Sequence, residues 1–202
     1  MSVARQVQTY FDRVASGYQQ ASGNPLWGRV RLREQRSFLR MLGPVAERDV
    51  LELGCGAGYY TRLVLAEGAK HVVACDFSEP MLAELPKANV TPLHGDAASI
   101  DPGRKFDVLV SAGMLEFVPD PAAVFVNAAR FANPGAKFAI LYPTRSLLGH
   151  LYQGFHRRNG MNIHLFDPAG LRAMAEAAGW TITRSTSAGP YSACARLERR
   201  TA

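Results

Sequence analysis

The sequence has few cysteines and no long apolar run. Its 202 residues include three cysteines, Cys55, Cys75 and Cys194, which are too few for a disulfide framework and fit a reducing compartment. No segment stays apolar long enough to span a membrane, and the N-terminus lacks the uninterrupted apolar core of a signal peptide. We therefore expect a cytoplasmic protein.

Motifs for nucleic acid and for metal ions are also missing. The net charge of +6 makes nucleic acid a partner to consider. However, we find no zinc knuckle, recognition helix or RNA-binding aromatic motif, and thus do not expect nucleic acid as a partner. No tight cluster of His, Cys and Asp occurs in the sequence, so no metal site is expected.

A buried strand that runs into a glycine turn organises the chain. Residues 50–53 are mostly apolar, and Gly54, Gly56 and Gly58 follow at alternate positions before helical spacing begins at Tyr59. Glycine suits such a turn because it adopts positive φ, and because a ligand can lie against backbone that has no Cβ. This pattern predicts a nucleotide-type site.

The glycine spacing argues against two common nucleotide sites. A dinucleotide fingerprint has its third glycine one residue later, and here an acidic residue, Glu52, lies in the end of the strand. No Lys-Ser or Lys-Thr pair follows the glycines, which excludes a phosphate-binding P-loop.

A second apolar run, residues 72–75, ends at Asp76. An acid roughly twenty residues beyond the glycine turn is placed to accept hydrogen bonds from both ribose hydroxyls of a nucleotide. The alternative is that Asp76 caps the next helix, although Ser78 is itself a good N-cap residue.

Residues 52–58, Glu-Leu-Gly-Cys-Gly-Ala-Gly, resemble the first motif of class I S-adenosylmethionine-dependent methyltransferases. The resemblance implies S-adenosyl-L-methionine as cofactor and S-adenosyl-L-homocysteine as product. It also implies that Glu52, Gly54, Cys55 and Gly56 form the cofactor site, with the turn under the methionine part of the cofactor.

The same resemblance implies the adenine contacts. Phe77 and Met81 would flank the adenine ring, although ordinary core packing explains these residue types equally well. After a third apolar run, residues 90–94, the Asp96 side chain would meet the adenine amino group and the Ala97 backbone amide would meet the ring.

A fourth strand, residues 106–111, should neighbour the first strand, so that Ser111 and Ala112 at its end face the reactive sulfonium. Many relatives carry His where this chain has Phe117, which implies an apolar wall in place of a base. Glu116 is either a catalytic carboxylate or a group that satisfies backbone amides at the following helix. Asn133, Pro134 and Gly135 predict a turn into a fifth strand, residues 136–141.

Two helices are expected to cap the sheet in the N-terminal segment, divided at residues 23–25. Residues 10–18 resemble the leader of the ubiquinone and menaquinone methyltransferase-like group of small-molecule methyltransferases, in which the leader closes over the cofactor. This resemblance adds Tyr18 to the cofactor site. Between Arg29 and Arg40 the sequence carries five arginines on a helix. These form either a solvated face or a dock for a lipid headgroup, an anionic substrate or an acidic carrier.

The insert after the fifth strand, residues 142–166, concentrates Tyr, Phe, His and Arg where substrates enter such a sheet. We interpret it as a substrate lid. His156 and His164 are candidate bases, with His156 favoured. The candidate substrate-contacting residues are Phe117, Tyr142, His150, Tyr152 and Phe155.

Asp167 and Pro168 predict the start of a last helix, and Gly179 its end, before two closing strands. We expect one α/β methyltransferase domain over residues 1–202, built on a Rossmann-like, doubly wound seven-stranded sheet with an antiparallel last strand. Residues 1–44 form the helical cap, 45–141 the cofactor-binding core, 142–166 the lid, and 167–202 the last helix and edge strands.

The expected function is methyl transfer from S-adenosyl-L-methionine to an oxygen, nitrogen or carbon of a small aromatic or lipid-like acceptor. Two alternatives stay open. An enzyme of the same fold can use the cofactor for a non-methylating reaction such as a cyclisation, and a non-catalytic module can bind the cofactor without turnover.

Overall fold

The computed structural model of the chain describes residues 7, 9–12 and 25–201. Residues 7 and 9–12 are helical, and the first long helix, α2 (Pro25–Leu42), follows. Tyr18 lies outside the described residues, so its predicted contact with the cofactor stays a prediction.

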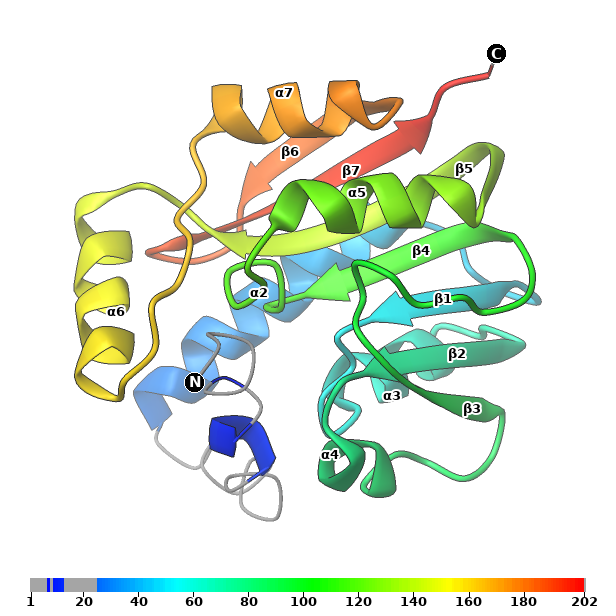
Figure 1. Cartoon of the computed structure of the whole chain (residues 1–202), viewed down its shortest axis with the longest axis horizontal. Helices are drawn as coiled ribbons and strands as arrows, with labels where there is room; N and C mark the ends of the chain where they lie inside the picture. The colour runs from blue at the N-terminus through cyan, green and yellow to red at the C-terminus, as the bar shows by residue number, and fades with distance from the viewer. Residues whose placement is uncertain (1–6, 8, 13–24, 202) are drawn as a thin grey trace.

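Seven strands form one sheet in the order β3-β2-β1-β4-β5-β7-β6 (Figure 1). Their bounds are β1 Asp49–Leu53, β2 His71–Asp76, β3 Val90–His94, β4 Phe106–Ala112, β5 Ala132–Pro143, β6 Trp180–Ser187 and β7 Ser192–Arg199. The first five strands pair in parallel, and β7 pairs antiparallel with both β5 and β6. The predicted doubly wound sheet with its antiparallel last strand is confirmed.

Helices cover both faces of the sheet (Figure 1). They are α2, α3 (Tyr59–Ala66), α4 (Glu79–Ala83), α5 (Pro121–Arg130), α6 (Leu147–Arg158) and α7 (Pro168–Ala177). Helices α5 and α7 lie in front of the sheet in Figure 1, α2 and α3 lie behind it, and α6 lies beyond the end of β5. Within the described part of the chain, no helix is both long and apolar enough to cross a membrane.

Alternation along the strands explains this two-sided cover. Leu51 and Leu53 of β1 belong to the core beneath α5 and α7, whereas Val50 belongs to the core beneath α2 and α3. The central strands are therefore apolar at consecutive positions, as a parallel sheet buried on both faces requires. Trp180 begins β6 fully buried, and its indole Nε1 donates to the Phe125 carbonyl of α5 at 3.0 Å.

Capping residues explain where several helices begin. The side chains of Ser78, Asp120 and Asp167 each accept a backbone amide in the first turn of α4, α5 and α7, and each helix has proline at its first or second position. The sequence predicts Ser78 and Asp167 in this role. At α6, Ser146 caps the helix by accepting from the Gly149 amide at 3.1 Å.

One strand begins earlier than the sequence indicates. The predicted turn at Asn133, Pro134 and Gly135 lies inside β5, which starts at Ala132. Phe106 pairs with Ala132 and Val108 with Lys137, so the extra residues of β5 bulge out between two paired positions. Proline and glycine are tolerated there because the bulged residues need no ladder hydrogen bond.

Candidate functional site

A cavity of about 430 Å³ opens at the carboxyl ends of β1, β2, β4 and β5. In a doubly wound sheet this is where ligands bind, at the point where the strand order reverses, here between β1 and β4. The predicted site residues that line it are Gly54, Cys55, Gly56, Asp76, Phe77, Met81, Ala112, Phe117, Tyr142, Tyr152 and His156.

The glycine turn forms one wall of the cavity. Gly54, Gly56 and Gly58 have φ of 73°, 51° and 82°, which is left-handed backbone that other residues adopt only at a cost. A Cβ on Gly54 would lie 2.2 Å from Met114 Cγ, so Gly54 is required by packing. A Cβ on Gly56 would meet no atom within 4 Å, so the backbone of Gly56 is open to a ligand.

Asp76 lies at the end of β2 and braces this turn. Its Oδ2 accepts from the Gly56 amide at 2.8 Å, and its Oδ1 accepts from the Ser78 amide at 3.0 Å. Burial raises the pKa of the carboxyl, and these backbone hydrogen bonds lower it in part. Each oxygen keeps further lone-pair capacity toward the cavity, which suits a ligand with adjacent hydroxyls.

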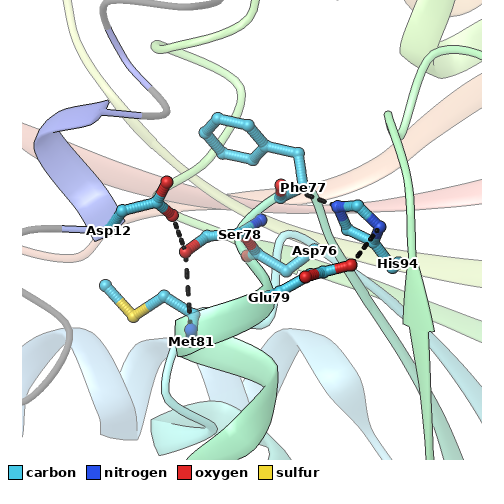
Figure 2. Close-up of polar contacts among 7 residues, drawn as sticks. All are labelled: Asp12, Asp76, Phe77, Ser78, Glu79, Met81 and His94. Atoms are coloured by element: carbon cyan, nitrogen blue, oxygen red, sulfur yellow. Dashed lines mark hydrogen bonds and ion pairs between the residues drawn. The ribbon is translucent and has the colours of Figure 1, made fainter.

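A polar network fixes the segment after Asp76 (Figure 2). Ser78 Oγ donates to Asp12 Oδ1 at 2.5 Å and accepts from the Met81 amide at 3.4 Å. On the other side, His94 Nε2 donates to the Phe77 carbonyl at 3.1 Å, and His94 Nδ1 lies 3.3 Å from Glu79 Oε1.

The Phe77 ring is consequently held toward the cavity, where it packs against a second aromatic side chain. The Phe11 ring lies edge-to-face with Phe77 at 6.3 Å and with Phe117 at 5.1 Å between centroids. The part of the N-terminal segment that the structure describes thus covers the cavity from above Phe77 and Phe117.

Glu52 does not line the cavity. It is buried in β1, where its Oε2 accepts from Thr61 Oγ1 of α3 at 2.6 Å. Burial, with a smaller contribution from the nearby Asp76 carboxyl, raises its pKa to about 8, although the hydrogen bond from Thr61 lowers it in part. In this structure, therefore, Glu52 joins strand to helix beneath the glycine turn, and its predicted contact with a cofactor stays a prediction.

The predicted adenine contacts after β3 are also outside the cavity lining. Asp96 is exposed, and its Oδ1 accepts from the Ala98 amide at 2.9 Å, while Ala97 is buried in the core under α5. Ser111 is buried at the end of β4 with no hydrogen-bond partner for its Oγ, and Ala112 next to it lines the cavity.

Of the candidate histidines, only His156 lines the cavity. Burial lowers its pKa to about 4, so the imidazole is neutral at physiological pH, and its buried Nδ1 has no hydrogen-bond partner. His164 is exposed on the far side of the insert, and His150 is exposed on α6, where its Nδ1 pairs with the Ser146 carbonyl at 2.8 Å.

Some of the predicted aromatic contacts also line the cavity, and one lies outside it. Tyr142 and Tyr152 line the cavity with Phe117, whereas Phe155 is 60% exposed on the outer face of α6. Tyr152 stacks on Tyr191 with ring centroids 4.5 Å apart and planes 14° apart. This pair gives the cavity a stacked aromatic surface.

The remaining lining includes residues that sequence reasoning missed. They are Tyr10, Phe11, Arg31, Glu34, Ala57, Tyr59, Tyr60, Arg62, Gly113, Met114, Leu141, Pro143, Tyr191 and Ser192. The sequence does contain a signal for Glu34, because it is the one acidic residue among the arginines of α2 and lies one helical turn from Arg31. The Glu34 Oε1 accepts from Ser192 Oγ at 2.7 Å.

Glu116 also lines the cavity, and it does not serve the helix that follows it. Asp120 caps α5 instead, accepting from the Ala122 amide at 3.0 Å and the Ala123 amide at 3.3 Å. Among the described residues, no group of three or more His, Cys, Asp or Glu side chains is arranged to hold a metal ion.

A doubly wound sheet, a glycine turn at its switch point and an acid ending the neighbouring strand together define an α/β domain of the nucleotide-cofactor-binding class. Sequence comparison then specifies the family. A family model described as "Methyltransferase domain" matches residues 26–185. The chain belongs to this family of methyltransferase domains.

Curated relatives match over part of their length. A "Probable S-adenosylmethionine-dependent methyltransferase" of Mycolicibacterium smegmatis is 31% identical over 118 residues, which are 56% of this chain and 45% of that protein. A "Ubiquinone biosynthesis O-methyltransferase" of Hahella chejuensis is 39% identical over 103 residues, or 44% of this chain and 40% of that protein. This chain thus spans about half the length of the curated relatives that it matches.

Solved structures share the fold over the whole chain. A Synechocystis magnesium protoporphyrin IX methyltransferase with bound SAH has a TM-score of 0.77 and 18% identity, covering 98% of this chain and 100% of that chain. The DhpI–SAH complex has a TM-score of 0.78 and 24% identity, covering 99% and 98%. The resemblance to class I methyltransferases stated from the sequence is confirmed at the level of family and fold.

Proposed function

We propose that this protein transfers a methyl group from S-adenosyl-L-methionine to an oxygen, nitrogen or carbon of a small acceptor. The observation that carries the proposal is the open backbone of Gly56, which faces the cavity beside the buried carboxylate of Asp76. Membership of the methyltransferase domain family supports it, as do the SAH-bound and SAM-bound structures of the same fold.

The residues present fit this cofactor. The backbone of Gly54, Cys55 and Gly56 would support its methionine part, and Asp76 would accept the ribose hydroxyls. Phe77 and Met81 would flank the adenine ring from β2 and α4. Tyr18, Glu52, Asp96, Ala97, Ser111 and Ala112 complete the proposed cofactor site, although Asp96 would have to turn from its own backbone contact to reach adenine.

When bound, the cofactor supplies a methyl group that is already activated on a sulfonium. The task of the chain is then to hold an acceptor in line with that group and to exclude water. The rings of Phe117, Tyr142 and Tyr152 provide apolar surface for a flat or lipid-like acceptor, and the two tyrosine hydroxyls add polar groups to it.

His156 would contribute as a neutral imidazole. With a pKa lowered to about 4 by burial, it is a poor base for a neutral hydroxyl but a good hydrogen-bond acceptor through a free Nδ1. His164, His150 and Phe155 would have to move to contact an acceptor in this cavity, since they lie outside its lining.

The larger organisation follows from this assignment. Residues 1–44 would act as cap, 45–141 as cofactor-binding core, 142–166 as substrate lid and 167–202 as the closing edge of one methyltransferase domain. Arg29, Arg33, Arg36 and Arg40 are exposed on α2 and would offer a peripheral contact for a membrane surface or an acidic carrier. Three free, buried cysteines suit a cytoplasmic location.

Calorimetric titration tests the cofactor first. Both S-adenosyl-L-methionine and S-adenosyl-L-homocysteine should bind at micromolar concentrations. The two molecules differ only in the methyl group and its charge on sulfur, so the proposed contacts to ribose, adenine and the methionine part are the same for both. Absence of binding for both would refute the proposal. Incubation with candidate acceptors and mass measurement should then reveal one added methyl, and cofactor binding without any methylated product would favour a non-methylating function.

A further inference from the structure

Glu116 is a buried carboxyl with one oxygen that has no hydrogen-bond partner. Its side chain is 3% exposed, it lines the cavity, and its Oε2 accepts no hydrogen bond. The ion pairs within the described part of the chain all join other residues. A carboxyl buried in this way destabilises the fold unless a ligand or a proton compensates it.

The backbone around Glu116 holds this carboxyl in place. The Glu116 carbonyl accepts from the His164 amide at 2.8 Å, which ties the segment after β4 to the insert. A Cβ on Gly113 would lie 3.9 Å from Glu116 Oε1, which is van der Waals contact, so Gly113 lies next to the carboxyl group. Glu116 thus lies just beyond β4, the strand next to the glycine turn.

A second carboxyl, Glu34 of α2, faces the same cavity. Burial raises the pKa of Glu34, while the Ser192 hydroxyl and the Arg31 guanidinium lower it. Burial, with a smaller contribution from the charge of Glu34, raises the pKa of Glu116 to about 8, although a hydrogen bond from its own backbone amide lowers it in part. The charge of Glu34 disfavours the ionisation of Glu116, and a cation bound near both carboxyls would stabilise their ionised forms.

Two arginines also line the cavity, and each has partners in the protein. Arg31 lies over the Tyr59 ring and lowers the pKa of Glu34, and Arg62 donates to backbone carbonyls of Ala57, Gly58 and Glu84. Tyr60, Tyr142 and Phe117 line the cavity with ring surfaces that attract positive charge. His156, whose ring lies 5.3 Å from that of Phe117, adds no positive charge because burial lowers its pKa to about 4.

The geometry points to a small amine as the methyl acceptor, bound as its ammonium ion with Glu116 as the counter-ion. This inference rests on the proposed methyl transfer and narrows the nucleophile to nitrogen. An acceptor carboxylate would be repelled by Glu34 and Glu116, and a neutral hydroxyl would leave the charge of Glu116 uncompensated.

The reaction balances with the residues present and the proposed cofactor. The ammonium N–H bond breaks as its proton passes to the Glu116 carboxylate, which leaves a neutral amine with a free electron pair. That pair forms the new C–N bond while the S–CH₃ bond breaks and its electrons stay on sulfur, giving S-adenosyl-L-homocysteine and a methylated ammonium. Glu116 then returns its proton to solvent.

Three probes that share a phenyl ring test the charge preference: phenethylamine, phenethyl alcohol and hydrocinnamate. Each is titrated calorimetrically into wild-type protein, with and without saturating S-adenosyl-L-homocysteine. We expect phenethylamine to bind at least about tenfold more tightly than either other probe in both conditions. Equal or tighter binding of the alcohol or the carboxylate would overturn the proposal.

The Glu116→Gln variant tests the residue, since the amide keeps the shape and removes the charge. We expect it to lose about tenfold or more in phenethylamine affinity and to keep its affinity for S-adenosyl-L-homocysteine. The exposed Glu176→Gln of α7 is the matched control and should leave both affinities unchanged. Unchanged phenethylamine affinity in Glu116→Gln would refute the assignment.

The cofactor titration separates the two proposals. If S-adenosyl-L-homocysteine binds and phenethylamine does not, the amine acceptor is refuted and the cofactor site stands. If phenethylamine binds only without S-adenosyl-L-homocysteine, the acidic pair serves the ammonium of the cofactor's own methionine part, which also overturns the inference. Should Glu116→Gln fail to fold, the probe series on wild-type protein still decides, because the charge preference is measured without any variant.

Discussion

The glycines of the turn after β1 differ in what surrounds them: one is enclosed by protein and another is open to a ligand. Gly54 and Gly56 belong to one sequence motif and both have positive φ, but Gly54 is closed by Met114 while Gly56 faces open space. Substitution at Gly54 would disturb the packing of β1 and the segment after β4. A substitution at Gly56 therefore tests ligand binding without a clash against neighbouring side chains.

Gly56→Ala should weaken S-adenosyl-L-homocysteine binding by at least about tenfold, because a new methyl occupies the surface on which the ligand would lie. The matched control is Gly103→Ala, which has φ of 71° and equally open space in the loop before β4. Both changes should cost about 1 kcal/mol of stability from the left-handed backbone, so only binding should separate them. Calorimetric affinities that fall equally in both variants would contradict the assignment.

At the scale of elements, α5 illustrates how local and tertiary contacts cooperate. Asp120 starts the helix by accepting two backbone amides, and Phe125 in its middle packs on Phe138 of β5 with ring centroids 6.0 Å apart. The Phe125 carbonyl in turn accepts a hydrogen bond from the indole N–H of Trp180 in β6. The helix thus joins the central strands to the antiparallel edge of the sheet.

Asp120→Ala should lower the free energy of unfolding by about 1 kcal/mol, because two amides of the first turn of α5 lose their acceptor. Asp101→Ala is the control, since the Asp101 carboxylate accepts from the Gly103 amide in an exposed loop outside any helix. Urea denaturation should give the larger change for Asp120→Ala. A larger loss in Asp101→Ala would show that the cap does not stabilise α5.

Elements were more predictable than side-chain contacts. The strand and helix order follows from apolar periodicity and from caps such as Ser78 and Asp167, which act locally. The early start of β5 was not predictable, because Pro134 and Gly135 read as a turn unless the bulge against β4 is known. The roles of Glu34 and Ser192 were hidden as well, since 158 positions of sequence separate the two residues that share a hydrogen bond.

The whole molecule contains buried acids whose ionisation opposes folding. Glu52 is the clearest case, because burial raises its pKa from 4.5 to about 8. At a pH between these two pKa values, Glu52 keeps its proton in the native state and has lost it in the unfolded chain. The free energy of unfolding therefore decreases as the pH rises through this window.

Glu52→Gln should flatten this dependence, since the amide has no proton to lose and can still accept from Thr61. The variant should gain stability relative to wild type as the pH rises from 5 to 8, by on the order of 1 kcal/mol or more. Urea denaturation at several pH values measures it, with the exposed Glu176→Gln as control. Parallel pH curves for wild type and Glu52→Gln would contradict the raised pKa of Glu52.

The sequence by itself determined the sheet, the helices that cover it and the glycine turn, because these depend on periodicity, capping and φ preferences that act over a few residues. It also determined the family, through residues 52–58. The tertiary structure decided which side chains meet in the cavity. Folding places His156 inside the cavity and His164 outside it, and it buries Glu116 in the cavity that Glu34 also lines. These positions depend on how α2, α6 and the insert pack together across the ends of the strands.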